Sequence, residues 1–226
     1  MNADHSVECR KSRVFVVDDH PIVRRGLSEL INREPDLAVC GEAGDVSKAL
    51  QSISVLKPDI LILDISLNGA DGIELLKNVR LRDLVLPVLV LSMHDEAIYA
   101  ERALRAGANG YIMKHEAPEK VLMALRRILG REVYVSDQVA NKMLQVYIGR
   151  SNVLTHTPVE GLTDRELEVF RLIGEGRATR QIAEELHLSV KTIESYQAHI
   201  KEKMLFRSAR ELMRHAVQWV INEKAV

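Results

Sequence analysis

Short apolar runs alternate with amphipathic segments along the first 130 residues of the chain. Five runs have the length and the Val, Ile and Leu content of buried strands: 13–17, 37–41, 60–64, 87–91 and 110–113. Helical spacing of apolar residues follows each run, at about 21–31, 46–53, 72–80, 96–105 and 118–129. This alternation predicts an α/β domain over residues 12–130, with a doubly wound, five-stranded parallel sheet.

The pattern changes beyond this domain. Residues 131–158 have spacing for one short helix, followed by a Gly-, Ser- and Thr-containing stretch that predicts a mobile linker. Residues 159–222 show only helical spacing, which predicts a second, all-α domain. Its first helix is expected to begin with a capping box from Thr163 to Glu166, and its third helix after Ser189 as N-cap.

Composition narrows the class of protein. Hydrophobic residues make up 46% of the chain and charged residues 28%, and no apolar stretch is long enough to cross a bilayer. There is no signal-peptide pattern, and Cys9 and Cys40 form no CxxC motif, so we expect a cytoplasmic protein without disulfides or structural zinc. The net charge of −1 requires any contact with nucleic acid to come from a local patch.

Polar residues follow four of the predicted strands. Asp18 and Asp19 follow the first, Asp64 the third, Ser92 the fourth and Lys114 the fifth. Singly, an Asp pair is usually a solvated turn and a loop Lys is usually exposed. The carboxyl ends of these strands, however, converge at one edge of such a sheet. Neighbouring carboxylates favour the binding of a hard divalent cation. Beside such a cation Asp64 could accept a phosphoryl group, whose oxygens Lys114 and Ser92 would contact.

Residues 12–130 resemble a response-regulator receiver domain, through Val17-Asp18-Asp19, Leu63-Asp64, Leu91-Ser92 and Gly110 to Lys114. The resemblance implies a flavodoxin-like fold in which a partner sensor histidine kinase phosphorylates Asp64. It further implies that Mg²⁺ is bound by Asp19, Asp64 and the backbone carbonyl of Ser66, while Asp18 acts mainly through water.

The same resemblance assigns a switch pair. Ser92 and Tyr111 match it, and Tyr111 is expected to turn inward when Ser92 engages the phosphoryl group. From its sequence alone, Tyr111 is equally an ordinary half-buried strand residue. One departure is Asn68, where the family often has Pro; this change is expected to loosen the loop without removing a chemical group.

Residues 162–208 have the spacing of a helix-turn-helix, but the pattern alone leaves a protein-interaction module equally open. Val190, Ile193, Ile200 and Met204 are expected to face the core. Basic residues concentrate near the proposed groove-binding helix: Arg177, Arg180, Lys191, Lys201, Lys203 and Arg207.

The segments at Leu162–Val169, Gly176, Ile182–Leu186 and Ser189–Tyr196 resemble the LuxR-type helix-turn-helix. The resemblance places phosphate contacts at Thr179, Arg180, Lys191 and Thr192, and base-reading positions at Glu194, Ser195 and Ala198, with Gln197 as a further candidate. Glu194 is suited to a cytosine amino group and Ala198 to a thymine methyl.

Two features of this domain leave open questions. Leu205 stands where the family usually has Gly or Asn, so we expect that turn to be built differently. Leu212, Ala216 and Trp219 match the family's dimer-contacting face, with core packing an equal alternative.

Together the two resemblances identify a NarL/FixJ-type response regulator over nearly the whole chain. They imply a DNA-binding transcriptional regulator that phosphorylation of Asp64 activates by dimerisation or by release of the C-terminal domain. The protein is not expected to be an enzyme, with at most slow self-phosphorylation from small phosphodonors and slow self-dephosphorylation. Expected partners are the kinase, double-stranded promoter DNA and a second copy after phosphorylation, with RNA polymerase a further candidate and no membrane.

One competing class is an aspartyl-nucleophile phosphatase, which would need an acid at position 66, where this chain has Ser66. The sequence identifies neither the kinase nor the promoters, and it does not distinguish activation from repression. It also leaves open the oligomeric state before phosphorylation and whether the receiver covers the DNA-binding helix.

Overall fold

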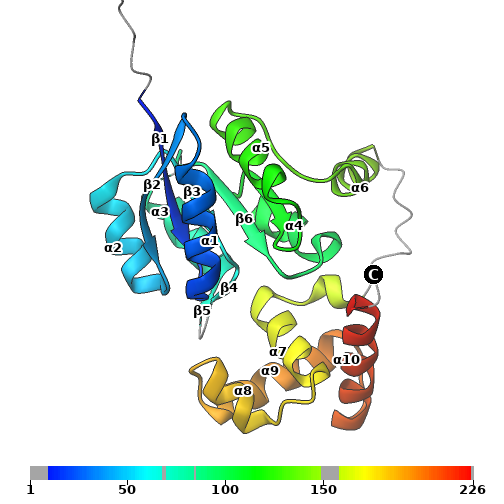
Figure 1. Cartoon of the computed structure of the whole chain (residues 1–226). Helices are drawn as coiled ribbons and strands as arrows, with labels where there is room; N and C mark the ends of the chain where they lie inside the picture. Colours follow the sequence, from blue (N-terminus) through cyan, green and yellow to red (C-terminus); the bar gives the residue numbers. More distant parts are fainter. Residues whose placement is uncertain (1–9, 68–69, 84, 149–157, 225–226) are drawn as a thin grey trace, which may run out of the picture.

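The computed structural model describes residues 10–67, 70–83, 85–148 and 158–224 (Figure 1). Its central sheet has five parallel strands in the order β2-β1-β3-β6-β7. They are β1 (Ser12–Val17), β2 (Leu37–Ala43), β3 (Ile60–Leu63), β6 (Val88–Ser92) and β7 (Gly110–Met113). The predicted doubly wound α/β fold is therefore confirmed, with each strand within two residues of its expected bounds.

Helices cover both faces of this sheet. In β1, Val14 and Val16 pack with α1 (Pro21–Asn32) and α5 (Pro118–Leu129). Phe15 and Val17 point to the other face. That face packs against α2 (Val46–Leu56), α3 (Gly72–Arg82) and α4 (Glu96–Arg105). Because successive side chains of a strand alternate between faces, a strand between two helical layers must be apolar throughout, as all four residues of β3 are.

The loop expected after β3 contains a short ladder. Strands β4 (Ser66–Leu67) and β5 (Ala70–Asp71) pair antiparallel, while Asn68 lies outside the described residues. The short helix predicted after the sheet domain is α6 (Asp137–Tyr147), and the expected linker at 149–157 lies outside the described residues. Helix α6 is tied to α4 by a hydrogen bond from Lys142 Nζ to the Ala97 carbonyl, 3.0 Å long.

The C-terminal domain is helical, with a short 3₁₀ turn η2 (Pro158–Gly161) followed by four α-helices. These are α7 (Asp164–Gly174), α8 (Thr179–Glu185), α9 (Val190–Lys203) and α10 (Ala209–Lys224). The predicted capping box is confirmed, with Thr163 and Glu166 exchanging side-chain-to-backbone hydrogen bonds. Ser189 caps α9 by accepting a hydrogen bond from the Thr192 N–H.

Leu205 shows that one expectation for this domain is wrong. The residue adopts the left-handed conformation, with φ of 57°, so the turn after α9 keeps the geometry that Gly or Asn would have. Its N–H still donates to the Glu202 carbonyl at 3.2 Å, and its side chain is 85% exposed. The bulky side chain therefore finds room in solvent, and only the local backbone strain remains.

The face of α10 suggested for dimer contacts lies inside the domain. Leu212 and Ala216 are buried, and Trp219 packs against Phe170 with ring centroids 5.7 Å apart. The alternative of core packing therefore describes these residues. The large exposed apolar residues of α10 are instead Met213 and Ile221.

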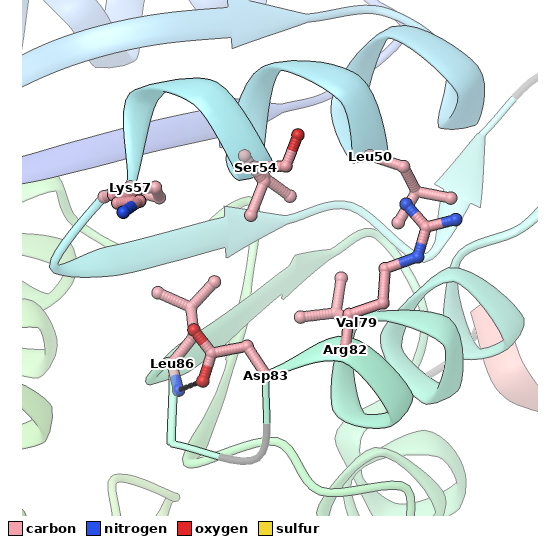
Figure 2. Close-up of a pocket in the computed structure, with 9 residues that line it drawn as sticks. Leu50, Ser54, Lys57, Val79, Arg82, Asp83 and Leu86 are labelled. Carbon is pink, nitrogen blue, oxygen red and sulfur yellow. Dashed lines mark hydrogen bonds between the residues drawn. The ribbon is translucent and has the colours of Figure 1, made fainter.

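A hollow of about 270 Å³ lies between α2 and α3 (Figure 2). Leu50, Val79 and Leu86 contribute to its lining, and Asp83 is held at its rim by hydrogen bonds from the Val85 and Leu86 N–H groups. It adjoins Pro58, before β3, and so lies at the opposite end of the strands from the acidic residues. Among the described residues, no helix is both long and apolar enough to span a bilayer.

Candidate functional site

An acidic pocket forms at the carboxyl ends of β1 and β3. These strands are neighbours, paired from Val14–Ile60 to Val17–Leu63, and so the acids that follow them meet. One side-chain ligand atom from each of Asp18, Asp19, His20 and Asp64 falls within a group whose members are all within 4.8 Å of one another. Asp18 is 2% exposed and Asp64 1% exposed. The pocket is therefore a cluster of carboxylates largely withdrawn from water.

Lys114 reaches this pocket from the end of β7. Its Nζ lies 2.6 Å from Asp18 Oδ2 and 2.6 Å from Asp64 Oδ2, so one ammonium bridges the acids of two strands. Burial raises the pKa of Asp64 above its usual value, although the Lys114 charge opposes this shift. For Lys114, burial alone would lower the pKa, but the two carboxylates together raise it.

Ser66 follows Asp64, Ser92 ends the neighbouring strand β6, and both residues are hydrogen-bonded. The Ser66 N–H donates to Asp64 Oδ1 at 2.9 Å. Ser92 is fully buried, and its Oγ accepts a hydrogen bond from the His94 N–H at 3.1 Å. The turn around Ser66 also needs Gly72, where an added Cβ would lie 2.4 Å from the Ile65 Cα and 2.5 Å from the Asp64 carbonyl oxygen.

Tyr111 is turned inward, towards the loop that follows β6. The residue is 1% exposed, and its hydroxyl donates to the His94 carbonyl at 2.9 Å. Burial strongly raises the pKa of this phenol, which stays protonated. That Tyr111 turns inward when Ser92 engages a phosphoryl group stays a prediction.

Two histidines of the site were missed in the sequence. His20 donates its N–H to Asp18 Oδ1 at 2.8 Å, and its Nδ1 lies 2.7 Å from Asp19 Oδ1. His94 Nε2 lies 2.8 Å from Ser66 Oγ. Burial, and to a smaller extent the Arg171 charge, lowers the pKa of His94 to about 3. The position of His20 directly after the Asp pair was a usable signal, whereas nothing in the apolar pattern pointed to His94.

The donor set fits a hard divalent cation. Three carboxylates face one ammonium in a buried pocket, which leaves negative charge uncompensated, and carboxylate oxygen is the ligand that Mg²⁺ prefers. Asp19, Asp64 and the Ser66 carbonyl remain the predicted ligands. The imidazole of His20 is an additional neighbour of this group.

The predicted DNA-binding residues gather on α8 and α9. Lys191, Glu194, Ser195 and Ala198 are exposed on α9, while Ile193 and Ile200 are fully buried on its opposite side. Val190 is 43% exposed, so placing it in the core was wrong: as the first residue of α9 it lies at the edge of the packed face.

Four further DNA-contact candidates also lie on α8 and α9. The amide of Gln197 donates to Thr179 Oγ1 at 3.2 Å and so joins α9 to the start of α8. Thr192 Oγ1 lies 2.7 Å from Ser189 Oγ. Arg180 is exposed and pairs loosely with Glu184 at 3.4 Å. The structure therefore brings Gln197 and Thr179 together, whereas Thr192 and Arg180 contact residues of their own helix or its cap.

Comparisons with known proteins match both domains. The family model described as "Response regulator receiver domain" matches residues 14–126, and that of "Bacterial regulatory proteins, luxR family" matches residues 160–216. The oxygen regulatory protein NreC of Staphylococcus haemolyticus is 33% identical over 210 residues, covering 91% of this chain and 97% of that protein.

Solved structures of response regulators are also similar to this chain. RcsB of Salmonella enterica serovar Typhimurium, bound to the rprA promoter with the phosphomimetic BeF3−, is 26% identical with a TM-score of 0.65. This match covers 92% of this chain and 99% of that one. A LuxR-family regulator from an Aurantimonas species is 34% identical with a TM-score of 0.57, covering 62% of this chain and 99% of that one. This chain belongs to the two-component response regulators that join a receiver domain to a LuxR-type helix-turn-helix domain, and it acts as a transcription factor of that family.

Proposed function

We propose that Asp64 accepts a phosphoryl group from a sensor histidine kinase. The observation that carries this proposal is the buried Asp64 carboxylate, held between the Lys114 ammonium at 2.6 Å and the Ser66 N–H at 2.9 Å. In the transfer, a carboxylate oxygen bonds to phosphorus while the bond from phosphorus to the kinase imidazole breaks. The Lys114 ammonium then shifts its contact from the carboxylate to the phosphoryl oxygens, and Ser92 donates a hydrogen bond to one of these oxygens.

Asp19, Asp64 and the Ser66 backbone carbonyl would hold Mg²⁺, with Asp18 contributing through water. The cation supplies positive charge that lets an anionic phosphoryl group approach three carboxylates. Lys114 alone balances only part of that charge. The site is thus an acceptor, with only slow self-phosphorylation and self-dephosphorylation. We place the protein in the cytoplasm, where its kinase and its target are accessible.

Labelling with a radioactive small phosphodonor such as acetyl phosphate tests the assignment. Asp64→Asn preserves the shape of the side chain and should abolish the acid-stable, base-labile label. The matched control is Asp59→Asn, because Asp59 lies at the other end of the same strand, where it accepts a hydrogen bond from the Arg13 N–H at 2.8 Å. Label that survives Asp64→Asn would overturn the assignment.

The proposed output is binding of promoter DNA by α9 in the major groove. Support comes from the exposed row of Lys191, Glu194, Ser195 and Ala198, and from the promoter complex of RcsB. Thr179, Arg180, Lys191 and Thr192 would contact phosphates, while Glu194, Ser195, Ala198 and Gln197 would read bases. Phosphorylation would promote a dimer on paired half-sites, from which the protein could contact RNA polymerase.

A titration with promoter fragments at several salt concentrations tests this output. Binding to DNA phosphates must weaken steeply with salt, because neutralised phosphates release counterions. Binding that is insensitive to salt would instead favour a helical module that holds a protein partner.

A further inference from the structure

The start of α7 packs against the receiver domain. The Arg102 guanidinium, on α4, donates to the Leu162 carbonyl at 2.8 Å and to the Val159 carbonyl at 3.2 Å. It also pairs with Asp164 Oδ1 at 3.0 Å, and Lys77 Nζ pairs with Asp164 Oδ2 at 2.9 Å. Arg102 and Asp164 are both largely buried, with side chains 16% and 19% exposed. Charged hydrogen bonds in such a setting are stronger than those at an open surface.

A cavity of about 20 Å³ lies beside this clamp. Its receiver side is lined by Ile65, Ile73, His94 and Tyr99, and its other side by α7 residues Asp164, Glu168 and Arg171. The His94 and Tyr99 rings stack with centroids 4.5 Å apart. Within the described part of the chain, Arg171 Nε is buried without a hydrogen-bond partner. An unsatisfied donor beside a void weakens an interface, so this contact is built to separate more readily than a domain core.

His94 also contacts the acidic site through both its backbone and its ring. Its N–H donates to Ser92 Oγ at 3.1 Å, and its carbonyl accepts from the Tyr111 hydroxyl at 2.9 Å. Its Nε2 lies 2.8 Å from Ser66 Oγ, in the turn that follows Asp64. Its ring therefore contacts the domain boundary while three hydrogen bonds attach it to the residues around the phosphorylation site.

We propose that Ile65, Ile73, His94, Tyr99 and Arg102 form a docking face for the start of α7, and that His94 couples this face to Asp64. The coupling rests on the proposed phosphorylation of Asp64. When the Ser92 hydroxyl turns to a phosphoryl oxygen, the hydrogen bond that its Oγ accepts from the His94 N–H is disturbed. The ring shifts against Tyr99, the contact with α7 weakens, and Arg102 releases the domain. His94 carries the signal because it is hydrogen-bonded to Ser66, Ser92 and Tyr111 and also lines the domain boundary.

The docked arrangement covers α7 and leaves the reading face of α9 open. Lys191, Glu194, Ser195 and Ala198 all remain exposed in it. Docking therefore leaves the domain able to read one half-site, and it restrains the domain from adopting the spacing that a paired site requires. Phosphorylation acts on pairing rather than on uncovering the recognition helix.

Hydrogen exchange on the full-length chain tests the docking face. His94→Ala and Arg102→Ala should raise exchange over residues 158–174 without phosphodonor, by shifting the docked-to-open ratio roughly tenfold or more. The matched controls are Met93→Ala, whose side chain is 63% exposed beside His94, and Arg105→Ala, whose side chain is 74% exposed on the same helix as Arg102. Both controls should leave exchange in that segment unchanged.

The phosphomimetic BeF3− with Mg²⁺ then separates the two proposals. Wild type should open on its addition, and His94→Ala should already be open and change no further. If His94→Ala opens only with BeF3−, or the controls open equally, the role of His94 is overturned. If BeF3− opens Asp64→Asn as well, the assignment of Asp64 fails while the docking face stands. Retained labelling of His94→Ala by acetyl phosphate shows that its receiver is folded.

DNA binding gives a second readout. Unphosphorylated wild type and Arg102→Ala should bind a single half-site within about twofold of each other, because α9 is exposed in both. On a paired half-site, Arg102→Ala should bind roughly tenfold more tightly than wild type. A similar gain on the single half-site would show that docking covers α9 and would overturn this inference.

Discussion

The acidic pocket and the proposed DNA-reading face of α9 are built on opposite physical principles. Asp18, Asp64 and Lys114 come from three strand ends and are almost completely buried, so each charge depends on the others. Lys191 and Glu194 come from one helix and are exposed, so water already solvates each of them. Buried, coupled charges make a site that fails as a unit, whereas exposed residues contribute nearly independently. A switch needs the first arrangement, and an adjustable reader of sequence needs the second.

Lys114→Met should have the largest effect, because it removes one of the coupled charges of the acidic pocket. It leaves the Asp18 and Asp64 carboxylates buried together without their ammonium, which should lower the free energy of unfolding by about 3–5 kcal/mol at neutral pH without Mg²⁺. Millimolar Mg²⁺ should restore part of this loss by replacing the missing charge. Urea unfolding followed by circular dichroism measures both.

Lys120→Met is the control for this substitution. Its ammonium is exposed to solvent and pairs with Glu116, so the change should leave the free energy of unfolding nearly unaltered. If Mg²⁺ does not restore any of the free energy of unfolding lost in Lys114→Met, the loss does not come from uncompensated charge in the pocket.

Gly72→Ala should damage the pocket through its backbone support. The added methyl would meet the Ile65 Cα and the Asp64 carbonyl at 2.4 and 2.5 Å, and relieving this clash should cost about 1–3 kcal/mol. The phosphorylation rate should fall as the turn around Asp64 moves. Gly26→Ala, an exposed helical position with no atom within 4 Å, should instead gain up to about 1 kcal/mol. Equal effects at the two glycines would show that the turn is not tightly packed.

The DNA-reading face should separate into two independent contributions. Lys191→Ala should reduce the slope of log affinity against log salt by about 1, whatever the DNA sequence. Glu194→Gln should leave that slope intact and change the preference at one base pair by about 1–3 kcal/mol. Fluorescence anisotropy with matched and mismatched fragments distinguishes them. Strong non-additivity in the double variant would show that this face is as coupled as the pocket.

Glu166 provides the smallest and most local test. Burial by itself would raise the pKa of this carboxyl, but the Lys203 ammonium at 2.6 Å and the Thr163 N–H outweigh it, so the pKa is lowered. Because the pKa is lowered in the folded state, the charged carboxylate stabilises the fold at pH values above its ordinary pKa of about 4.3. That stability is lost as the pH falls through the folded-state pKa.

Glu166→Gln should therefore cost about 1–2 kcal/mol at pH 7 and flatten the acid dependence below pH ~4.5. Trp219, the one tryptophan of the chain, lies on α10 against Phe170 and reports on this domain by fluorescence. Unchanged acid dependence in the variant would show that another group carries it.

The elements were predictable because periodicity is local. The strand that precedes Asp64 is apolar throughout, and α9 begins at its Ser189 cap, and both signals lie within a few neighbouring residues. The small ladder after β3 was missed because each of its strands has only two residues, too few for any alternation to show. The turn at Leu205 was predicted wrongly because a bulky residue is usually strained at positive φ. Here the side chain points into solvent, so the residue adopts that conformation.

By itself, the sequence determined the order of elements, the presence of two domains and the chemical groups placed at the strand ends. These follow from side-chain type and spacing along the chain. Only the tertiary structure decided that Lys114 bridges Asp18 and Asp64, that Tyr111 lies inward and that His94 joins the pocket to α7. Each of these contacts joins residues far apart in sequence, and its free energy depends on burial and distance, which arise only when the elements pack together.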